Sequence, residues 1–127
     1  MSRTPINTDK APAAIGPYSQ AVVANGIAYL SGQIAIDPET QELVDGNLQE
    51  QTFLVMENIK AVLTAAGSDF SKVIKASIFL APNQEFSLVN TIYGSYFDGA
   101  YPARETVWVH ALPKNVKIEI SMIAMVG

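Results

Sequence analysis

The stretch from Asn47 to Gly67 constrains the fold more than any other part of the sequence. Apolar residues recur there every three or four positions, which is the spacing of one face of an α-helix. The apolar stripe consists of Leu48, Val55, Ile59, Val62 and Ala66, and it is widened by Phe53, Met56 and Leu63. Asn47 and Glu50 have the spacing of a capping box, and Gly67 stands where a glycine commonly ends a helix. The sequence therefore predicts an amphipathic helix of about five turns, whose apolar face needs a second layer to cover it.

Segments on both sides of this helix have the composition of β-strands. The first two flank Asn25-Gly26, a dipeptide typical of two-residue hairpin turns because both residues tolerate a positive φ. Ser31-Gly32 interrupts the second strand, as at a bulge or where another group approaches the backbone closely. The predicted strands cover residues 18–24, 27–36, 72–80, 103–112 and 116–126, and a second helix covers residues 84–98.

The element order β-β-α-β-α-β-β predicts an α+β fold in which two helices pack on one face of a mixed sheet. We expect the turn at residues 113–115 to join the last two strands as a hairpin. Apolar residues occupy both faces of the last strand, although two helices can cover only one face of the sheet. The other face is therefore expected to be buried in an oligomer.

The composition excludes several classes of function. The sequence has no cysteine and one histidine, His110, so thiolate chemistry and a metal cluster built from histidines are excluded. Twelve acidic and eight basic residues give a net charge of −4, which argues against nucleic-acid and membrane partners. No apolar run approaches the ~18 residues of a membrane span, and the N-terminus has no apolar secretory segment. We expect a soluble, cytoplasmic protein that forms a single domain over residues 1–127.

Two charged residues in the predicted strands are candidates for chemistry. Arg104 is the one arginine besides Arg3, which lies in the N-terminal tail. An arginine can bind a carboxylate or phosphate through two parallel hydrogen bonds, and its alternative roles here are a salt bridge or a surface charge. Glu119 lies within an apolar strand, where it could position or deprotonate a water, neutralise Arg104 or face solvent opposite Lys117. The expected hairpin would bring Glu119 near Arg104, or leave it short of that end.

Other polar groups have weaker claims to a site. Asn90 lies on the apolar stripe of the second helix, where its amide needs a partner, either a ligand or a backbone group. Tyr18 follows Gly16-Pro17 and could offer its hydroxyl to a site, although a core tyrosine is the commoner outcome. Ser31-Gly32 could present a hydroxyl and open backbone groups, or could be a bulge alone.

Four sequence segments, taken in order, resemble the RidA/YjgF (reactive intermediate deaminase A) family over essentially the whole chain. The segments are Ala11–Ala21, Ser31-Gly32-Gln33-Ile34, Ala65-Ala66-Gly67 followed by Lys72–Lys75, and Pro102-Ala103-Arg104 with Leu112-Pro113 and Lys117–Ile120. The resemblance implies a chorismate-mutase-like α+β fold. It further implies a homotrimer whose sheets form a central barrel, with active sites in clefts between neighbouring subunits.

The same resemblance implies hydrolysis of 2-imino or enamine acids, such as 2-iminobutanoate and 2-aminoacrylate, to 2-keto acids and ammonia. These substrates are released by pyridoxal-phosphate-dependent dehydratases, whereas the deaminase itself uses no cofactor and no metal. By position, Arg104 would hold the substrate carboxylate and Glu119 would engage the attacking water. The pocket would be lined by Tyr18, Ser31, Gly32, Asn90 and Thr106.

Thr106 departs from the family pattern, because many members have cysteine at this position. Threonine cannot form a thiolate, although its backbone groups can still orient a substrate. Two alternative functions stay open. One is a non-catalytic module that binds a small carboxylate and regulates a partner, and the other is a ribonuclease or translation inhibitor. The acidic composition and the single histidine argue against a conventional ribonuclease site.

Overall fold

The long amphipathic helix is present in the computed structural model, which describes residues 2–127, as α1 (Leu48–Ala65). Both hydrogen bonds of the predicted capping box form: Glu50 N donates to Asn47 Oδ1 over 2.8 Å, and Asn47 N donates to Glu50 Oε1 over 2.9 Å. Gly67 follows the helix with a φ of 80°, a conformation that glycine adopts without strain. The apolar stripe is buried except at Phe53, which is 56% exposed, so the predicted widening of the stripe is wrong at that residue.

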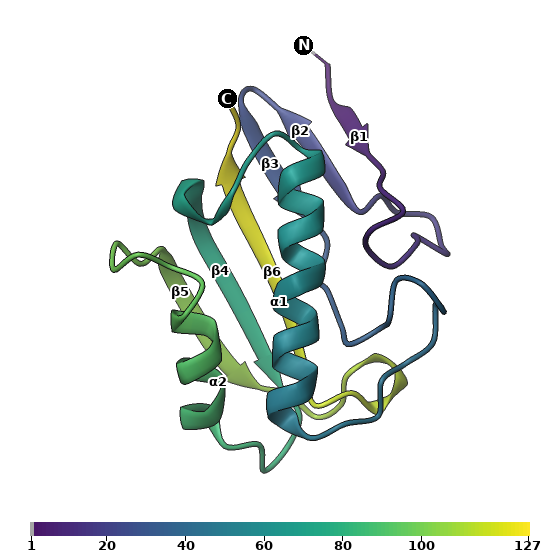
Figure 1. Ribbon diagram of the computed structural model, residues 1–127, viewed down its shortest axis with the longest axis vertical. Helices are drawn as coiled ribbons and strands as arrows, with labels where there is room; N and C mark the ends of the chain where they lie inside the picture. The colour runs from purple at the N-terminus through teal and green to yellow at the C-terminus, as the bar shows by residue number, and fades with distance from the viewer. Residues whose placement is uncertain (1) are drawn as a thin grey trace.

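The sheet has six strands in the order β1-β2-β3-β6-β4-β5 (Figure 1). The strands are β1 (Thr4–Ile6), β2 (Ala21–Ala24), β3 (Ile27–Leu30), β4 (Val73–Leu80), β5 (Ala103–Trp108) and β6 (Ile118–Met125), and the second helix is α2 (Phe86–Gly94). Single 3₁₀ turns lie at Phe70–Lys72 and Pro113–Asn115. Among the strands of residues 2–127, only β4 and β5 pair in parallel, since α2 forms the crossover between them, and the other pairs are antiparallel.

Three features differ from the predicted order. β1, which the sequence analysis placed in the tail, pairs with β2 and adds a strand before the expected order begins. β3 ends at Leu30, and the predicted strand continues only as an isolated bridge between Gln33 and Ile120. The last two strands do not form a hairpin, because β6 inserts between β3 and β4 while β5 lies at the edge. The fully apolar helix-side face of β6 explains its central place, since a central strand is buried more completely than an edge strand.

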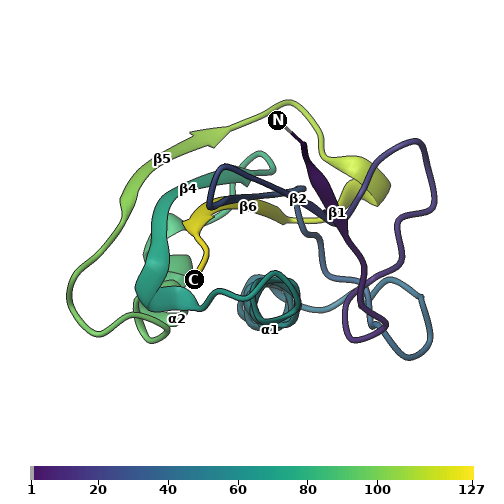
Figure 2. The ribbon, with the colours of Figure 1, turned by 90° about the horizontal axis from the view of Figure 1, so that it is seen from above.

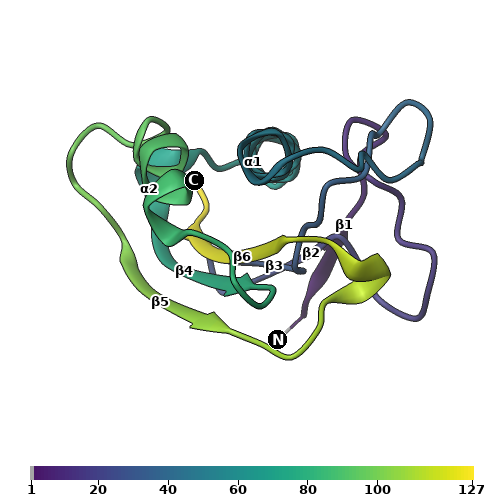
Figure 3. The same cartoon turned by 90° about the horizontal axis from the view of Figure 1, so that it is seen from below.

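The predicted α+β architecture with both helices on one face of a mixed sheet is confirmed. Figures 2 and 3 show α1 and α2 on the same side of the strands. The core lies between these layers and includes Val55, Ile59, Ile78, Ile120 and Met122, each no more than 1% exposed. No helix of the chain covers the opposite face of the sheet, called here the open face, over the described residues, and Tyr29, Val107 and Met125 on it are partly exposed.

The hairpin predicted at Asn25-Gly26 also forms. These two residues have φ values of 53° and 73°, the left-handed conformation that a type I′ turn requires at both central positions. β2 and β3 pair on either side of the turn, with Ala24 opposite Ile27. This pairing brings residues 18–20, which precede β2, next to Ser31 and Gly32 at the far end of β3.

Candidate functional site

Glu119 lies on the wall of a cavity of about 530 Å³ between β6 and the N-terminal loop. Tyr18, Ser31 and Gly32 line the same cavity, so the structure brings together four of the residues predicted for the site. Half-burial raises the pKa of Glu119 above its usual value of 4.5, because desolvation disfavours the charged carboxylate. We call this group the Glu119 half-site.

The Glu119 carboxylate lies directly against Gly32. A Cβ atom added at Gly32 would lie 2.1 Å from Glu119 Oε2, closer than any non-bonded contact allows. The expectation that a group approaches the backbone at this glycine is therefore confirmed, and the approaching group is the predicted base. The absence of a side chain at Gly32 lets the carboxylate lie against the backbone of the loop.

The serine beside this glycine has a structural hydrogen bond. Ser31 Oγ donates to the backbone oxygen of Ser19 over 2.6 Å, and Ser31 N donates to the oxygen of Gln20 over 3.0 Å. These bonds fix the loop that carries Tyr18 against the end of β3. Tyr18 itself is 53% exposed, so its ring stands at the mouth of the cavity rather than in the core.

Gln20 also lines this cavity and supports its wall. It was not predicted from the sequence as a site residue. This side chain is 2% exposed. Its Oε1 accepts from Thr8 N over 2.7 Å, and its Nε2 donates to the backbone oxygens of Thr8 and Pro12 over 3.0 and 2.8 Å. One buried amide thereby ties residues 8–12 to the start of β2. Its position directly before an apolar strand was the only signal, and that signal does not distinguish a buried amide from a surface one.

Arg104 lies in a second cavity, of about 480 Å³, together with Asn90 and Tyr93. Arg104 Nη1 donates to Asn90 Oδ1 over 3.0 Å, so the Asn90 amide does have a partner, but it is the arginine side chain and neither of the two predicted kinds. Cζ of the guanidinium lies 4.8 Å from the ring centroid of Phe86 and 5.0 Å from that of Tyr93. Burial raises the pKa of the Tyr93 hydroxyl, and the nearby Arg104 charge partly opposes that shift. We call this group the Arg104 half-site.

Thr106 lies near Arg104 on β5 but does not line the cavity of the Arg104 half-site. It follows Arg104 by two positions on β5, so the two side chains project to the same face of the sheet. Within residues 2–127, the buried side-chain oxygens of Thr106 and Tyr93 have no hydrogen-bond partner. Buried hydroxyls are nearly always bonded, so two unpaired ones close to Arg104 are an unusual feature of this part of the sheet.

Strand pairing places Arg104 and Glu119 on opposite faces of the sheet. Arg104 pairs with Ala76, which is fully buried beneath the helices, whereas Glu119 pairs with Phe79 on the open face. Successive residues of a strand project to opposite faces, and paired residues project to the same face. The expectation that a hairpin brings Glu119 near Arg104 is thus wrong, as is the alternative that Glu119 neutralises it. Within one chain the two half-sites cannot act on the same small molecule.

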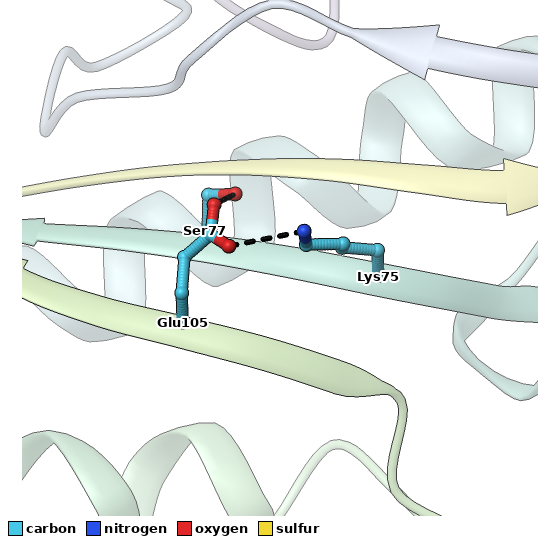
Figure 4. Close-up of polar contacts among 3 residues, drawn as sticks. All are labelled: Lys75, Ser77 and Glu105. Atoms are coloured by element: carbon cyan, nitrogen blue, oxygen red, sulfur yellow. Dashed lines mark hydrogen bonds and ion pairs between the residues drawn. The ribbon is translucent and has the colours of Figure 1, made fainter.

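The open face also carries a polar group whose residues line neither half-site cavity. Lys75 Nζ lies 3.0 Å from Glu105 Oε1, and Ser77 Oγ donates to Glu105 Oε2 over 2.8 Å (Figure 4). The lysine and the serine hydroxyl hold the pKa of Glu105 below its usual value. Figure 4 shows this cluster on β4 and β5 with the helices behind the sheet. These three side chains bond to one another and do not extend either half-site.

Residues 2–127 contain no group of three or more histidine, cysteine, aspartate or glutamate side chains suited to a metal ion. In the same range, no helix has the length and apolarity needed to cross a membrane.

Fold and half-sites together define an α+β protein that presents a guanidinium and a half-buried carboxylate on opposite faces of one sheet. The chain belongs to the endoribonuclease L-PSP family, whose model matches residues 8–126. The family resemblance of the sequence is thereby confirmed.

Several known proteins are similar to this chain over nearly its whole length. Protein DfrA of Myxococcus xanthus is 54% identical over 127 residues, which cover 98% of this chain and 97% of that protein. The 2-iminobutanoate/2-iminopropanoate deaminase of Bos taurus is 47% identical and covers 100% of this chain and 93% of its own. The crystal structure of YyfA, a Rid-family protein of Yersinia pestis, has a TM-score of 0.95 at 49% identity, covering 98% of this chain and 100% of that one.

Proposed function

We propose that this protein is a 2-iminobutanoate/2-iminopropanoate deaminase, which hydrolyses reactive 2-imino acids to 2-keto acids and ammonia. The observation that carries this proposal is the Arg104 half-site. A guanidinium at the surface, held by Asn90, matches the carboxylate that every 2-imino acid carries. The full-length similarity to a mammalian deaminase at 47% identity supports the same reaction.

The proposed active site combines half-sites from two chains. Arg104 and Glu119 face away from each other across one sheet, so a neighbouring chain must supply the second half of each site. The partly exposed apolar residues of the open face, Tyr29, Val107 and Met125, support an assembly that covers this face. We take the assembly to be a homotrimer of single-domain chains, with its sheets around a central barrel and one site at each interface.

In the proposed reaction, Arg104 holds the substrate carboxylate and orients the imine carbon. Water attacks that carbon while Glu119 accepts a proton from the water. The π electrons of the carbon–nitrogen double bond move to the nitrogen, which takes up a proton, and a carbinolamine results. The amino nitrogen then takes up the proton held by Glu119, and the remaining carbon–nitrogen bond breaks with its electron pair leaving on ammonia. The hydroxyl group loses its proton to the Glu119 carboxylate as the carbonyl of the 2-keto acid forms. A carboxylate whose pKa is raised by burial is a stronger base than an exposed one, which suits Glu119 to this role. Tyr18, Ser31, Gly32 and Thr106 would line the pocket around the substrate.

Enamines and imines of this kind are formed by pyridoxal-phosphate-dependent dehydratases, so such an enzyme is the proposed source of substrate. The proposal includes a cytoplasmic location, which the absence of cysteine fits because a reducing compartment makes no use of disulfides. The reaction as written needs neither a cofactor nor a metal ion.

The test couples the protein to a threonine dehydratase and follows the imine by competition with semicarbazide. Wild-type protein should increase keto-acid formation at the expense of semicarbazone, and Arg104→Ala should abolish this effect. Arg3→Ala is the matched control, since it removes the one other arginine of the chain. Binding of 2-oxobutanoate without any acceleration would instead identify a carboxylate-binding module, and equal activity of Arg104→Ala with an intact assembly would refute the proposal.

A further inference from the structure

Arg104 lies at the centre of a row of aromatic side chains that runs along α2 and β5. Phe86 and Tyr93 are about two turns apart on α2, and the ring centroids of both lie within 5.0 Å of the guanidinium carbon. Asn90 stands between them on the same side of the helix and accepts a hydrogen bond from Nη1. Three successive positions on one helix face therefore contact a single guanidinium.

Both ends of this row are fixed by further contacts. The rings of Phe86 and Trp108 meet edge to face with centroids 6.2 Å apart, and Trp108 Nε1 donates to the backbone oxygen of Gln84 over 3.0 Å. At the other end, the centroids of Tyr93 and Phe97 lie 4.9 Å apart, and Tyr93 is 3% exposed. The Tyr93 ring is thus packed in the core, and the Phe86 ring is held against Trp108, which is itself bonded to the chain at Gln84.

This arrangement restrains the charge without using its hydrogen-bond donors. An aromatic ring attracts a cation through its face, so Phe86 and Tyr93 leave the N–H groups of Arg104 free. Asn90 takes one of the five N–H donors, and those that remain suffice for a bidentate carboxylate. A free arginine side chain loses much conformational freedom when it binds, whereas one ordered in advance loses less and binds more tightly.

We propose that Phe86 and Tyr93 are positioning residues whose rings, together with Asn90, hold Arg104 in the orientation that binds a substrate carboxylate. The identity of the ligand, a small 2-keto or 2-imino acid, rests on the function proposed above. The restraint of Arg104 itself does not depend on that function. The two rings would thus increase the affinity for substrate in addition to packing in the protein.

The restraint is measurable directly, because Arg3 and Arg104 are the only arginines in the sequence. Nitrogen–carbon NMR of the guanidinium groups should therefore contain two sets of signals. Arg104 should show slow rotation about its Nε–Cζ bond, and exposed Arg3 should show averaged signals. Phe86→Leu, which removes the ring and keeps most of the apolar volume, should speed the Arg104 rotation by about fivefold or more. Phe86→Tyr, which keeps the ring, should leave it near the wild-type rate.

The kinetic counterpart separates positioning from general destabilisation. Phe86→Leu should raise KM for the imine and Kd for 2-oxobutanoate by about five- to tenfold, with kcat changed less than twofold. Phe86→Tyr should restore both constants. The control is Phe70→Leu, because the Phe70 ring packs against Tyr96 and Phe97 in the same layer. That variant should lose stability without a rise in KM.

These outcomes keep the two proposals apart. If Phe86→Leu and wild type show the same Arg104 rotation rate, or if Phe70→Leu raises KM as much as Phe86→Leu does, the positioning role is overturned. A wild-type protein that neither binds 2-oxobutanoate nor accelerates imine hydrolysis overturns the proposed function instead. In that event the NMR comparison still decides whether the rings restrain Arg104.

Discussion

Gly32 has no side chain, and this allows the carboxylate of Glu119, the candidate base, to lie in its observed position. Gly32→Ala should displace the Glu119 carboxylate, since the new Cβ would lie 2.1 Å from Oε2. Gly32 has no positive φ, so the backbone accepts alanine without strain. We expect kcat for imine hydrolysis to fall by about tenfold or more, within the range that a positioned base contributes.

Gly46→Ala provides the matched control for this substitution. A Cβ at Gly46 would lie 2.9 Å from Glu50 Oε1, so it also displaces a carboxylate, but one that belongs to the capping box of α1. This control should lower the midpoint of thermal unfolding and leave kcat unchanged. If both variants lose turnover equally, the effect of Gly32→Ala reflects loss of structure and not displacement of a base.

The pH dependence of Glu119 gives a second test at this scale. Burial raises its pKa above 4.5, so activity that requires the carboxylate should decline on the acidic side at a pH above that value. The folded protein also binds this proton more tightly than the unfolded chain does, so the contribution of Glu119 to stability falls as pH rises between the two pKa values. Glu119→Gln should therefore be more stable than wild type at pH 7, with the difference vanishing near pH 4, and should lose turnover. Urea unfolding at both pH values measures this, and equal pH dependence of the two proteins would contradict it.

The sequence singled out the charged residues of the candidate site but not the residues that support them. Arg104 stood out because it is one of two arginines, and Glu119 because it interrupts an apolar strand. Gln20, Phe86 and Tyr93 carry no comparable signal. The sequence does not distinguish a buried glutamine from an exposed one. Aromatic residues on a helix face are expected in a core whether or not they contact a cation. Their roles follow from contacts between distant segments, which a single sequence does not specify.

The N-terminal loop is the element whose structure depends most on one side chain. Gln20→Met should destabilise the protein by about 2 kcal/mol, since it leaves partly buried backbone groups of Thr8 and Pro12 without their protein partners. Hydrogen exchange should rise selectively at residues 8–12, because these are the residues that the amide holds. Exposed Gln49→Met on α1 is the control and should change neither quantity. Uniform exchange throughout the chain would show that Gln20 supports the whole fold and not this loop.

Helices were easier to predict than strand pairings for a physical reason. α1 is specified by local contacts, a capping box and a terminal glycine that lie within the helix and its immediate flanks. Strand partners lie far apart in sequence, so the position of β6 between β3 and β4 depends on the whole set of apolar faces. The turn at residues 113–115 favoured a hairpin locally, but β5 was already paired in parallel with β4 through the α2 crossover. The short strand β1 has no sequence pattern of its own and forms by pairing with β2.

For the whole molecule, the proposed trimer predicts that two inactive variants regain activity when their chains are mixed. A site contained within one chain would not give this result. Arg104→Ala and Glu119→Gln should each be inactive as pure proteins, because each lacks one half of every site. When the two variants are unfolded together in equal amounts and refolded, chains mix at random. A site is complete only when an intact Arg104 from one chain meets an intact Glu119 from its neighbour. We therefore expect about one quarter of the wild-type activity to return.

The same mixing experiment decides where each site is assembled. Recovery depends on the two half-sites lying on opposite faces of one sheet, so that every complete site draws on two chains. A double variant that carries both substitutions on the same chain, mixed with wild-type chains in equal amounts, is the control for assembly and should also give about one quarter of the activity in this arrangement. If each chain instead held a whole site, the first mixture would remain inactive and the second would retain about half. The two mixtures therefore give equal activities if sites are shared between chains and unequal activities if they are not.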